Sequence, residues 1–342
     1  MGDTQSLDTN AVAAFLKDRL PGFDGPVDAV KFEGGQSNPT FLLKTGAGNY
    51  VLRRKPPGQL LKSAHAVDRE FRVQSALYGS DVPVARMHVL CEDPTVVGSD
   101  FYVMDHVAGR NFNEPTMEGM TPEGRGAGID DMGRVLAALH DVDIDAVGLA
   151  DYGPPGHYLA RQVARWSKQY RASETQDIPA MNALMDRLAA EMPADDGQRT
   201  LVHGDYRIDN MIFEAEGTKC LAVLDWELST IGHPYADLAS VIMQWQLPAG
   251  AQGRGLMGVA RAALGLPSDE AFIAAYCARR GLSGVDHFGY FLGFCFFRMA
   301  AIIQGVLKRA LDGNASNPER AMQVGAFVPV FAQNGLKALD SQ

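Results

Sequence analysis

The chain has 342 residues, of which 46% are hydrophobic and 21% are charged, so it is long enough for one large globular domain or two lobes. Its formal net charge of −10 argues against nucleic acid or an anionic membrane as the main partner, because both bind basic surfaces. We therefore expect neither partner, and the composition leaves the oligomeric state open.

The four cysteines and the N-terminal segment indicate a cellular compartment. Cys91, Cys220, Cys277 and Cys295 lack Cys-x-x-Cys spacing and mostly lie in apolar runs, which is typical of reduced, buried thiols. The N-terminal segment is acidic and has no apolar signal-peptide core. We therefore expect a cytoplasmic protein. The longest apolar run, 288–307, contains Arg298 and Gln304, which favours a buried helix over a membrane span.

The first hundred residues predict a small lobe of strands and helices. Short β-prone runs alternate with glycine-containing turns, and helical periodicity covers the segments before and after the first three runs. The predicted elements are a helix at 8–20, strands at 27–33, 40–44 and 50–53, a helix at 63–78, and strands at 87–91 and 101–104.

From residue 121 onward the pattern is mainly helical, and a short β-hairpin between residues 211 and 224 interrupts it. Helices are expected at 121–140, 156–172, 178–191, 234–246, 268–280, 285–311 and 318–337.

Residues 203–210 read His-Gly-Asp-Tyr-Arg-Ile-Asp-Asn and contain the side chains that phosphoryl transfer requires. The reaction needs a base near the acceptor hydroxyl, ligands for Mg²⁺ and groups that neutralise charge on the phosphates. Asp205 precedes Asn210 by five positions, as the base precedes the metal-binding Asn in the catalytic loop of protein kinases. Asp205 is the candidate base, and Asn210 is a candidate Mg²⁺ ligand.

A second metal ligand is expected after the hairpin. The strands at 211–213 and 220–224 flank a polar turn, and their pairing would return Asp225 beside Asn210. A lone His-Gly-Asp or Asp-Trp pair is more often a turn or a helix cap. Both pairs at this spacing, with strands between them, favour a catalytic site. The sequence therefore predicts an α+β, two-lobed, protein-kinase-like fold. It divides into a β-rich N-lobe at 1–107 and a helical C-lobe at 108–342, with nucleotide bound in the cleft between them.

The N-lobe supplies candidate phosphate-binding residues. Glycines in a loop between the first two strands let backbone N–H groups approach phosphates, although an ordinary hairpin turn is an equal alternative. Arg53 ends the third strand, where kinases have a phosphate-binding lysine, and Glu70 is its matching carboxylate on the following helix. Glu70 could also be a solvated helix residue. The loop residues are Gly34, Gly35, Gln36, Ser37 and Asn38.

Charged residues around the catalytic loop suggest supporting roles. Arg207 could stabilise transition-state charge, or it could be a surface arginine that pairs with Asp209 or Glu214. His203 is expected to orient the loop. Asp237, near the start of the next helix, is the candidate structural anchor of the loop, and Glu227 could assist the metal through water.

These motifs together resemble the aminoglycoside phosphotransferase and choline kinase superfamily, and most of all its branch related to the kinase-like domain of acyl-CoA dehydrogenase fusion proteins. The resemblance covers nearly the whole chain. It implies that the backbone at Met104, and around Asp105 to Val107, holds adenine, that ATP is the phosphoryl donor, and that Mg²⁺ is the cofactor. The motifs that carry it are residues 34–38, 50–57, 101–104, 203–210 and 224–234.

The acceptor is expected to be a small-molecule alcohol, because Trp226-Glu227 stands where protein kinases have Phe-Gly and no activation segment follows. The resemblance favours a hydroxyacyl substrate, such as an acyl-CoA-like ester, over an aminoglycoside or macrolide antibiotic. A pseudokinase that binds nucleotide or acyl groups without transfer is a further alternative. Aromatic residues on the last long helix could line an acyl-binding cleft with Arg298, although such a stripe is more often plain core.

Overall fold

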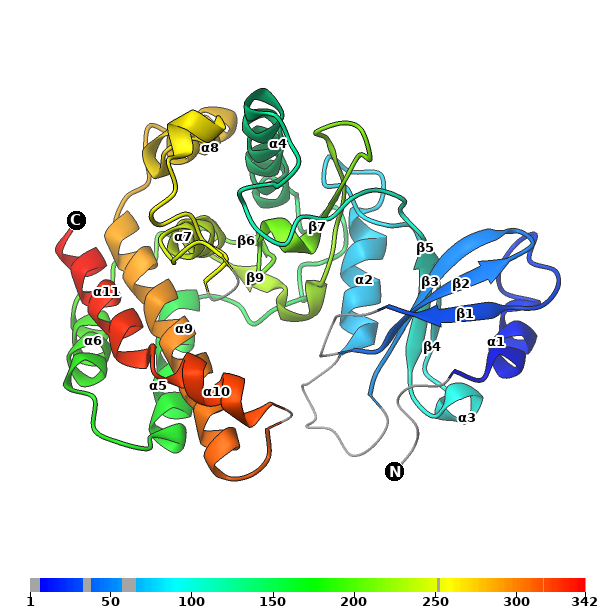
Figure 1. Ribbon diagram of the computed structural model, residues 1–342, viewed down its shortest axis with the longest axis horizontal. Coiled ribbons are helices and arrows are strands. Elements are labelled where there is room, and N and C mark those ends of the chain that lie inside the picture. Colours follow the sequence, from blue (N-terminus) through cyan, green and yellow to red (C-terminus); the bar gives the residue numbers. More distant parts are fainter. Residues whose placement is uncertain (1–6, 33–37, 57–65, 251–252, 316, 342) are drawn as a thin grey trace. The chain divides into compact units, whose positions relative to one another are not determined.

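The computed structural model describes residues 7–32, 38–56, 66–250, 253–315 and 317–341. The fold is mixed α+β, with a β-sheet in the N-terminal region and helices in the C-terminal region, as predicted (Figure 1). Contacts divide the chain into two compact units. The first contains Met1–Phe112, Asp145–Leu149 and Arg207–Ser229, and the second contains Asn113–Ile144, Ala150–Tyr206 and Thr230–Gln342. The segment Arg207–Ser229, which contains the predicted hairpin, thus groups with the N-terminal sheet, whereas the division between lobes at residue 107 stays a prediction.

The first unit is built on a five-stranded antiparallel sheet of order β1-β2-β3-β5-β4. Its strands are β1 (Asp28–Lys31), β2 (Thr40–Thr45), β3 (Gly48–Arg54), β4 (Met87–Cys91) and β5 (Phe101–Asp105). The other elements of this unit are α1 (Thr9–Leu16), α2 (Val67–Leu77), α3 (Pro94–Val97), η1 (Ile208–Asn210), β7 (Met211–Phe213), β8 (Cys220–Val223) and η2 (Trp226–Leu228).

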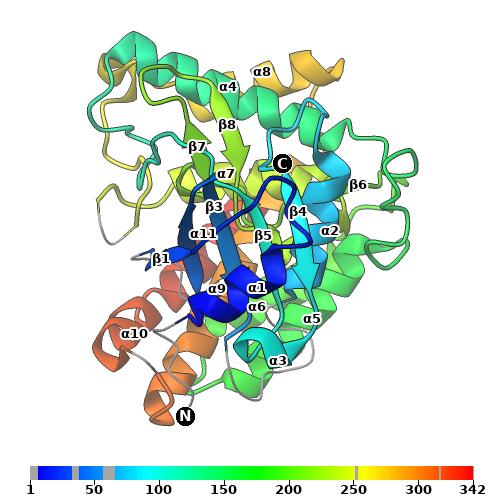
Figure 2. The same cartoon turned by 90° about the vertical axis from the view of Figure 1, so that its right-hand side faces the viewer.

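Alternation along the strands gives this sheet two buried faces. Leu52 and Phe101 belong to the apolar cluster that α1 covers, whereas their chain neighbours Val51 and Tyr102 belong to a cluster with α2. Successive side chains of a strand point to opposite faces, so one sequence run supplies both cores. Figure 1 and Figure 2 show α1 and α2 on opposite sides of the sheet. This packing fixes β3 and α2, which carry the predicted phosphate-binding pair.

The second unit is a helical assembly around α9 (Phe288–Leu311), which packs against α5, α6, α7, α10 and α11. Its strands β6 and β9 form an antiparallel pair, with Leu201 opposite Ile231. The elements besides α9 are α4 (Pro122–His140), α5 (Tyr158–Ser173), α6 (Pro179–Ala190), β6 (Thr200–Val202), β9 (Thr230–Gly232), α7 (Pro234–Trp245), η3 (Arg261–Leu264), α8 (Asp269–Arg280), α10 (Pro318–Gly325) and α11 (Val328–Asp340).

Helix α9 includes the long apolar run. Within the described part of the chain, it is the one helix that is long and apolar enough to cross a membrane by length and composition, and 72% of its apolar 18-residue segment is buried inside the protein. A mostly buried core helix has the same properties, so the expected buried helix agrees with the packing observed around α9.

The single helix expected at 318–337 is wrong, because the chain forms two helices there. Helix α10 ends at Gly325, and α11 begins at Val328 with Pro329 in its first turn. Proline lacks a backbone N–H and is tolerated in the first turn of a helix but not in its interior. Pro329 therefore sets a helix start at this point.

Candidate active site

The hairpin of the first unit brings the two predicted metal ligands together. Strands β7 and β8 pair with Met211 opposite Val223, and the Leu224 amide donates to the Asn210 carbonyl at 2.8 Å. Asn210 lies immediately before β7, and Asp225 follows Leu224 with a left-handed backbone (φ 64°). The predicted return of Asp225 to Asn210 is confirmed. Their side chains therefore start from one end of the hairpin.

Asn111 fixes the backbone on both sides of Asn210. Its Nδ2 donates to the carbonyl of Asp209 at 2.8 Å and to the carbonyl of Met211 at 2.9 Å. Sequence reasoning did not identify this residue, because Asn111 lies about a hundred positions before the loop that it contacts. No local pattern signals such a pairing.

Arg53 lies on β3 with only 13% of its side chain exposed, and it contacts three carboxylates of the same unit. Its Nη2 lies 2.6 Å from Oδ1 of Asp225, and its Nε lies 3.1 Å from Oε2 of Glu70. Glu227 is more distant, at 3.9 Å from Nη2. Burial disfavours the charged guanidinium, but Glu70 and the other groups around it hold the pKa of Arg53 above its ordinary value. The predicted pairing of Arg53 with Glu70 is confirmed.

Glu70 is fully buried on α2, which rules out the solvated alternative. Its Oε1 accepts a hydrogen bond from Asn38 Nδ2 at 3.0 Å, and its Oε2 accepts one from the Tyr102 hydroxyl at 3.0 Å. Burial raises the pKa of Glu70 to about 7, against the opposing effect of Arg53. Glu70 therefore orients Arg53 from the buried face of α2, and Tyr102 is a supporting residue to which the sequence assigned no role.

The glycine loop can be assessed at one position. Gly34, Gly35, Gln36 and Ser37 lie outside the described residues. Asn38 is 1% exposed, and its amide contacts Glu70. The side chain of Asn38 thus supports Arg53 indirectly, so any direct phosphate contact from this loop stays a prediction for its other residues.

The predicted adenine-binding segment starts on β5. Met104 is buried beside Val107, and the Asp105 amide donates to the carbonyl of Arg86 at 2.9 Å. The His106 amide donates to the carbonyl of Asn49 at 3.3 Å. These two amides are used within the fold, so adenine contacts from this segment would fall to its remaining backbone groups.

Arg207 pairs with Asp209, which was the alternative to a role in stabilising transition-state charge. Its Nε and Nη2 donate to the two carboxylate oxygens of Asp209, at 2.8 and 2.6 Å. A bidentate pair of this kind fixes the guanidinium plane. A catalytic role for Arg207 stays a prediction, and it would require the guanidinium to share or leave Asp209.

The second unit holds the loop that carries Asp205. This loop follows β6, and Asp237 of α7 anchors it, with Oδ2 accepting from the His203 amide at 2.6 Å and Oδ1 from the Gly204 amide at 2.9 Å. Burial alone would raise the pKa of Asp237, but His140 and these backbone donors hold it below its usual range. The Asp205 amide donates to Nδ1 of His203 at 3.2 Å. The expected roles of Asp237 and His203 in orienting the loop are confirmed.

The anchor extends into a buried polar network. His140 places Nε2 at 3.6 Å from Oδ2 of Asp237, and its Nδ1 lies 2.7 Å from the Tyr276 hydroxyl. Arg280 donates to the same hydroxyl at 2.9 Å and to Oδ1 of Asp141 at 2.8 Å. Burial favours the neutral imidazole and lowers the pKa of His140, against the opposing effect of Asp237. Hydrogen bonds therefore connect Asp141 at the surface to His140, whose Nε2 lies 3.6 Å from the carboxylate that anchors the loop.

The donor set of the first unit fits Mg²⁺. Asp225 offers carboxylate oxygens and Asn210 offers an amide oxygen, and both are hard donors that Mg²⁺ prefers. Among the residues that the structure describes, no group of three or more His, Cys, Asp or Glu side chains is placed to hold a metal. Mg²⁺ typically uses one or two protein carboxylates and takes its other ligands from phosphates and water. The set is therefore suited to a metal that arrives with a nucleotide.

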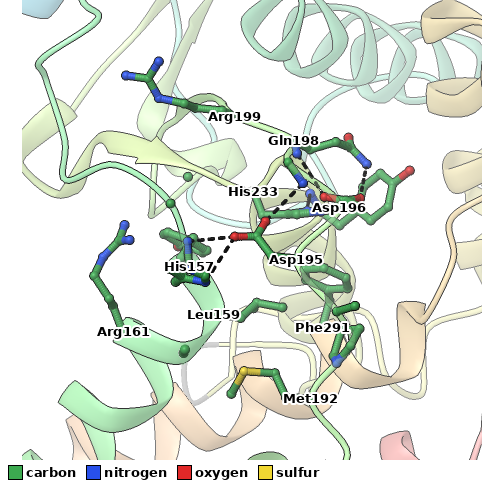
Figure 3. A pocket seen from close by; sticks show the side chains of 18 of the residues that line it. His157, Leu159, Arg161, Met192, Asp195, Asp196, Gln198, Arg199, His233 and Phe291 are labelled. Carbon is green, nitrogen blue, oxygen red and sulfur yellow. Dashed lines mark hydrogen bonds and ion pairs between the residues drawn. The ribbon is translucent and has the colours of Figure 1, made fainter.

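A cavity of about 540 Å³ lies in the second unit (Figure 3). Its apolar wall includes Leu159, Ile231 and Phe291, and its polar wall carries Asp195 beside His157 and Asp196 beside His233. None of the predicted catalytic, nucleotide-binding or metal-binding residues is among the described side chains that line it. Of the aromatic stripe, Phe291 lines the cavity, whereas Tyr290, Phe294, Phe296 and Phe297 are at most 1% exposed and form plain core.

Comparison with known proteins defines the class. The chain belongs to the phosphotransferase enzyme family, whose signature matches residues 28–284. Acyl-CoA dehydrogenase family member 10 from Mus musculus is 41% identical over 332 residues, which make up 96% of this chain and 31% of that protein. The chain therefore spans 31% of the length of this relative, which is less than a third.

Two solved structures share the fold. A protein from Ralstonia eutropha that was provisionally assigned as an aminoglycoside phosphotransferase superposes with a TM-score of 0.90 at 44% identity, over 98% of this chain and 99% of that one. Aminoglycoside phosphotransferase APH(4)-Ia, in complex with AMP-PNP and hygromycin B, gives a TM-score of 0.64 at 16% identity over 96% and 98% of the two chains. At that identity the likeness shows the fold alone. The chain is therefore a member of the phosphotransferase enzyme family and has the kinase-like fold.

Proposed function

We propose that this chain is an ATP- and Mg²⁺-dependent phosphotransferase that phosphorylates the hydroxyl group of a small molecule. The acceptor that we propose is a hydroxyacyl compound, either the free hydroxy acid or its CoA ester. The observation that carries the proposal is the contact of buried Arg53 with both Glu70 and Asp225 in the first unit. A permanently charged, oriented guanidinium next to a metal ligand is suited to a triphosphate.

Each residue has a defined task in this reaction. Arg53 would bind phosphate oxygens, while the backbone groups around Met104 and Val107 would hold adenine. Asn210 and Asp225 would hold Mg²⁺, which neutralises phosphate charge when bound. Asp205 would accept the proton of the acceptor hydroxyl while the oxygen of that hydroxyl bonds to the γ-phosphorus of ATP. The bond from that phosphorus to the β,γ-bridging oxygen breaks, and ADP leaves.

Two observations support an acyl acceptor. The relative that matches nearly all of this chain is named an acyl-CoA dehydrogenase family member, and most of that protein lies outside the match. A phosphotransferase segment joined to such an enzyme is expected to act on related acyl compounds. The cavity in the unit that carries Asp205 has an apolar wall at Leu159, Ile231 and Phe291, which suits an alkyl chain.

An antibiotic kinase is the second candidate. It is favoured by the provisional assignment of the Ralstonia eutropha protein, which is 44% identical to this chain. An aminoglycoside is a polycation that requires exposed acceptor carboxylates. Asp195 and Asp196 of the cavity, whose side chains are 40% and 46% exposed, are the candidate carboxylates, and each also accepts a hydrogen bond from a backbone amide, at 3.1 Å from Gly197 and 3.0 Å from Gln198.

The test is Mg²⁺-dependent ADP release from ATP with hydroxyacyl-CoAs, free hydroxy acids, choline, aminoglycosides and macrolides as acceptors. We expect stimulation by hydroxyacyl-CoAs that disappears in Asp205→Ala. Stimulation by aminoglycosides or macrolides alone would replace the acyl proposal with the antibiotic one. ATP binding without Mg²⁺ dependence, and with no acceptor turned over, would indicate a pseudokinase.

A further inference from the structure

We infer that Arg298 is a positioning residue for the catalytic base: its guanidinium holds the peptide group that leads into Asp205. Arg298 Nη2 donates to the carbonyl of Gly204 at 2.5 Å. The catalytic part of this inference rests on the proposed role of Asp205 as base.

Both ends of the peptide between Gly204 and Asp205 are fixed. Its carbonyl accepts from Arg298, and its N–H, which belongs to Asp205, donates to Nδ1 of His203 at 3.2 Å. The preceding peptide is fixed as well, because the Gly204 amide donates to Asp237. Together these hydrogen bonds define the backbone from which the Asp205 side chain extends.

Gly204 allows this arrangement because of its backbone conformation. Its φ is +83°, in a region that glycine adopts without the steric cost that other residues meet. A turn of this kind directs the amide and the carbonyl of one residue to separate partners. Asp237 and Arg298, which bear opposite charges, are those partners, and each charge matches the dipole end that it contacts.

Arg298 and Asp237 come from two helices that pack together, α9 and α7. Cys295, one turn before Arg298, places Sγ at 3.4 Å from the carbonyl of Ala236, next to Asp237. Asp237 and Arg298, which hold the amide and the carbonyl of Gly204, therefore extend from two helices that are packed against each other. A charge-assisted hydrogen bond from a fixed helix orients a loop more strictly than one from a flexible segment.

The charge of Arg298 lacks a carboxylate partner among the residues that the structure describes. Among the described residues, no carboxylate pairs with Arg298 within 4.0 Å, although its side chain is partly buried. A partly buried guanidinium usually lies beside a carboxylate, and this one instead contacts a catalytic-loop carbonyl. Structural stability alone would be served by a neutral donor at this position, so the arginine indicates a role at the base.

The experiment compares wild type, Arg298→Ala and Arg298→Lys. The matched control is Arg279→Ala, which removes an arginine of the same unit whose partner is the exposed Asp130. Hydrogen exchange is followed for the amides of residues 203–206, and kcat and the KM for ATP are measured with the best acceptor of the panel.

In Arg298→Ala we expect amide exchange at 203–206 to accelerate about fivefold or more, because one hydrogen bond of the loop is lost. We expect kcat to fall about tenfold or more, since small displacements of a catalytic group are costly. The KM for ATP should stay within about twofold, because the residues proposed to bind ATP are untouched. Arg298→Lys should recover part of kcat, since an ammonium also donates to a carbonyl.

Unchanged exchange at 203–206, or wild-type kcat in Arg298→Ala, would overturn the inference. If Arg298→Ala does not fold, Arg298→Lys decides, because full activity with unaltered exchange in that variant would also overturn it. If wild type turns over none of the acceptors while Arg298→Ala still accelerates exchange, the proposed function fails and the hold of Arg298 on the loop stands.

Discussion

Arg53 Nη2 lies 2.6 Å from Oδ1 of Asp225, so a proposed phosphate ligand and a proposed metal ligand form an ion pair. Glu70 restrains the same guanidinium through Nε, at 3.1 Å from Oε2. When nucleotide binds, the guanidinium must be shared between Asp225 and the phosphates. The arginine at this position matters for that reason, since its fork has five donors whereas a lysine is a point charge.

We predict that Arg53→Met weakens ATP binding on the order of tenfold or more, because a charge-assisted hydrogen bond contributes about 1.5–3 kcal/mol. Arg53→Lys should lose less, because a positive charge remains but the contacts to Glu70 and Asp225 cannot both be kept. Isothermal titration with Mg²⁺-ATP measures both effects. The control is Lys44→Met on an exposed part of β2, for which we expect wild-type affinity. Equal affinities for Arg53→Met and the control would exclude phosphate binding by Arg53.

We predict that Asp237→Asn lowers the free energy of unfolding by about 2–4 kcal/mol, because the change removes a buried charge that accepts two backbone hydrogen bonds. Urea denaturation followed by circular dichroism measures the change. The matched control is Asp130→Asn, which breaks an exposed ion pair with Arg279 and should cost less than about 1 kcal/mol. A comparable loss in both variants would contradict the anchoring role of Asp237.

The parts of this site that could be predicted come from segments that are contiguous in the chain or that match a known pattern of positions. The loop at 203–210 and the hairpin after it are contiguous, so spacing was enough to bring Asn210 and Asp225 together. Arg53 and Glu70 could be paired because their places, at the end of the third strand and on the following helix, match those of the lysine and glutamate that pair in kinases. The partners that were missed, Tyr102 on Glu70 and Arg298 on Gly204, join segments far apart in the chain, and their pairing depends on tertiary packing.

The same limit applies to the fold. Strands β6 and β9 are only three residues each and gave no alternating pattern long enough to recognise. Each is stabilised by its partner, with Leu201 opposite Ile231, so neither signal is local. The break between α10 and α11 did have a local signal in Pro329, and it could have been predicted from the preference of proline for the first turn of a helix.

We predict that protonation of His140 lowers the free energy of unfolding as the pH falls below about 6.5, in opposition to Glu70, whose raised pKa of about 7 favours the folded state as the pH falls. Burial lowers the pKa of this residue in the folded state below its value of 6.5 in the unfolded chain. Between these two pKa values the unfolded state binds more protons, so the free energy of unfolding rises with pH. Asp237, whose pKa is also lowered, adds a loss of the same sign at lower pH.

Urea midpoints at pH 5 and pH 7.5 measure this dependence. His140→Asn should be less stable than wild type at pH 7.5, because the contact with the Tyr276 hydroxyl changes, but its midpoint should vary less between the two pH values. His157→Asn provides the comparison, since the side chain of His157 is 81% exposed and should leave the wild-type dependence intact. A His140→Asn protein with the full wild-type dependence would show that the proton binds elsewhere.

We predict that Asp225→Asn changes the two forms of ATP binding in opposite directions. Without Mg²⁺, the carboxylate of Asp225 competes with the triphosphate for Arg53 and repels the negative charge of the triphosphate. Neutralising this carboxylate should therefore strengthen the binding of metal-free ATP several-fold, by about 1 kcal/mol. With Mg²⁺, the same change removes a metal ligand and should weaken binding about tenfold or more. Titrations in EDTA and in excess Mg²⁺ measure the two affinities.

Asp209→Asn, which changes a carboxylate paired with Arg207 in the same unit, tests whether any loss of negative charge has this effect. Opposite shifts confined to Asp225→Asn would assign the metal to this residue, whereas parallel shifts in both variants would indicate that only the overall charge near the phosphates matters.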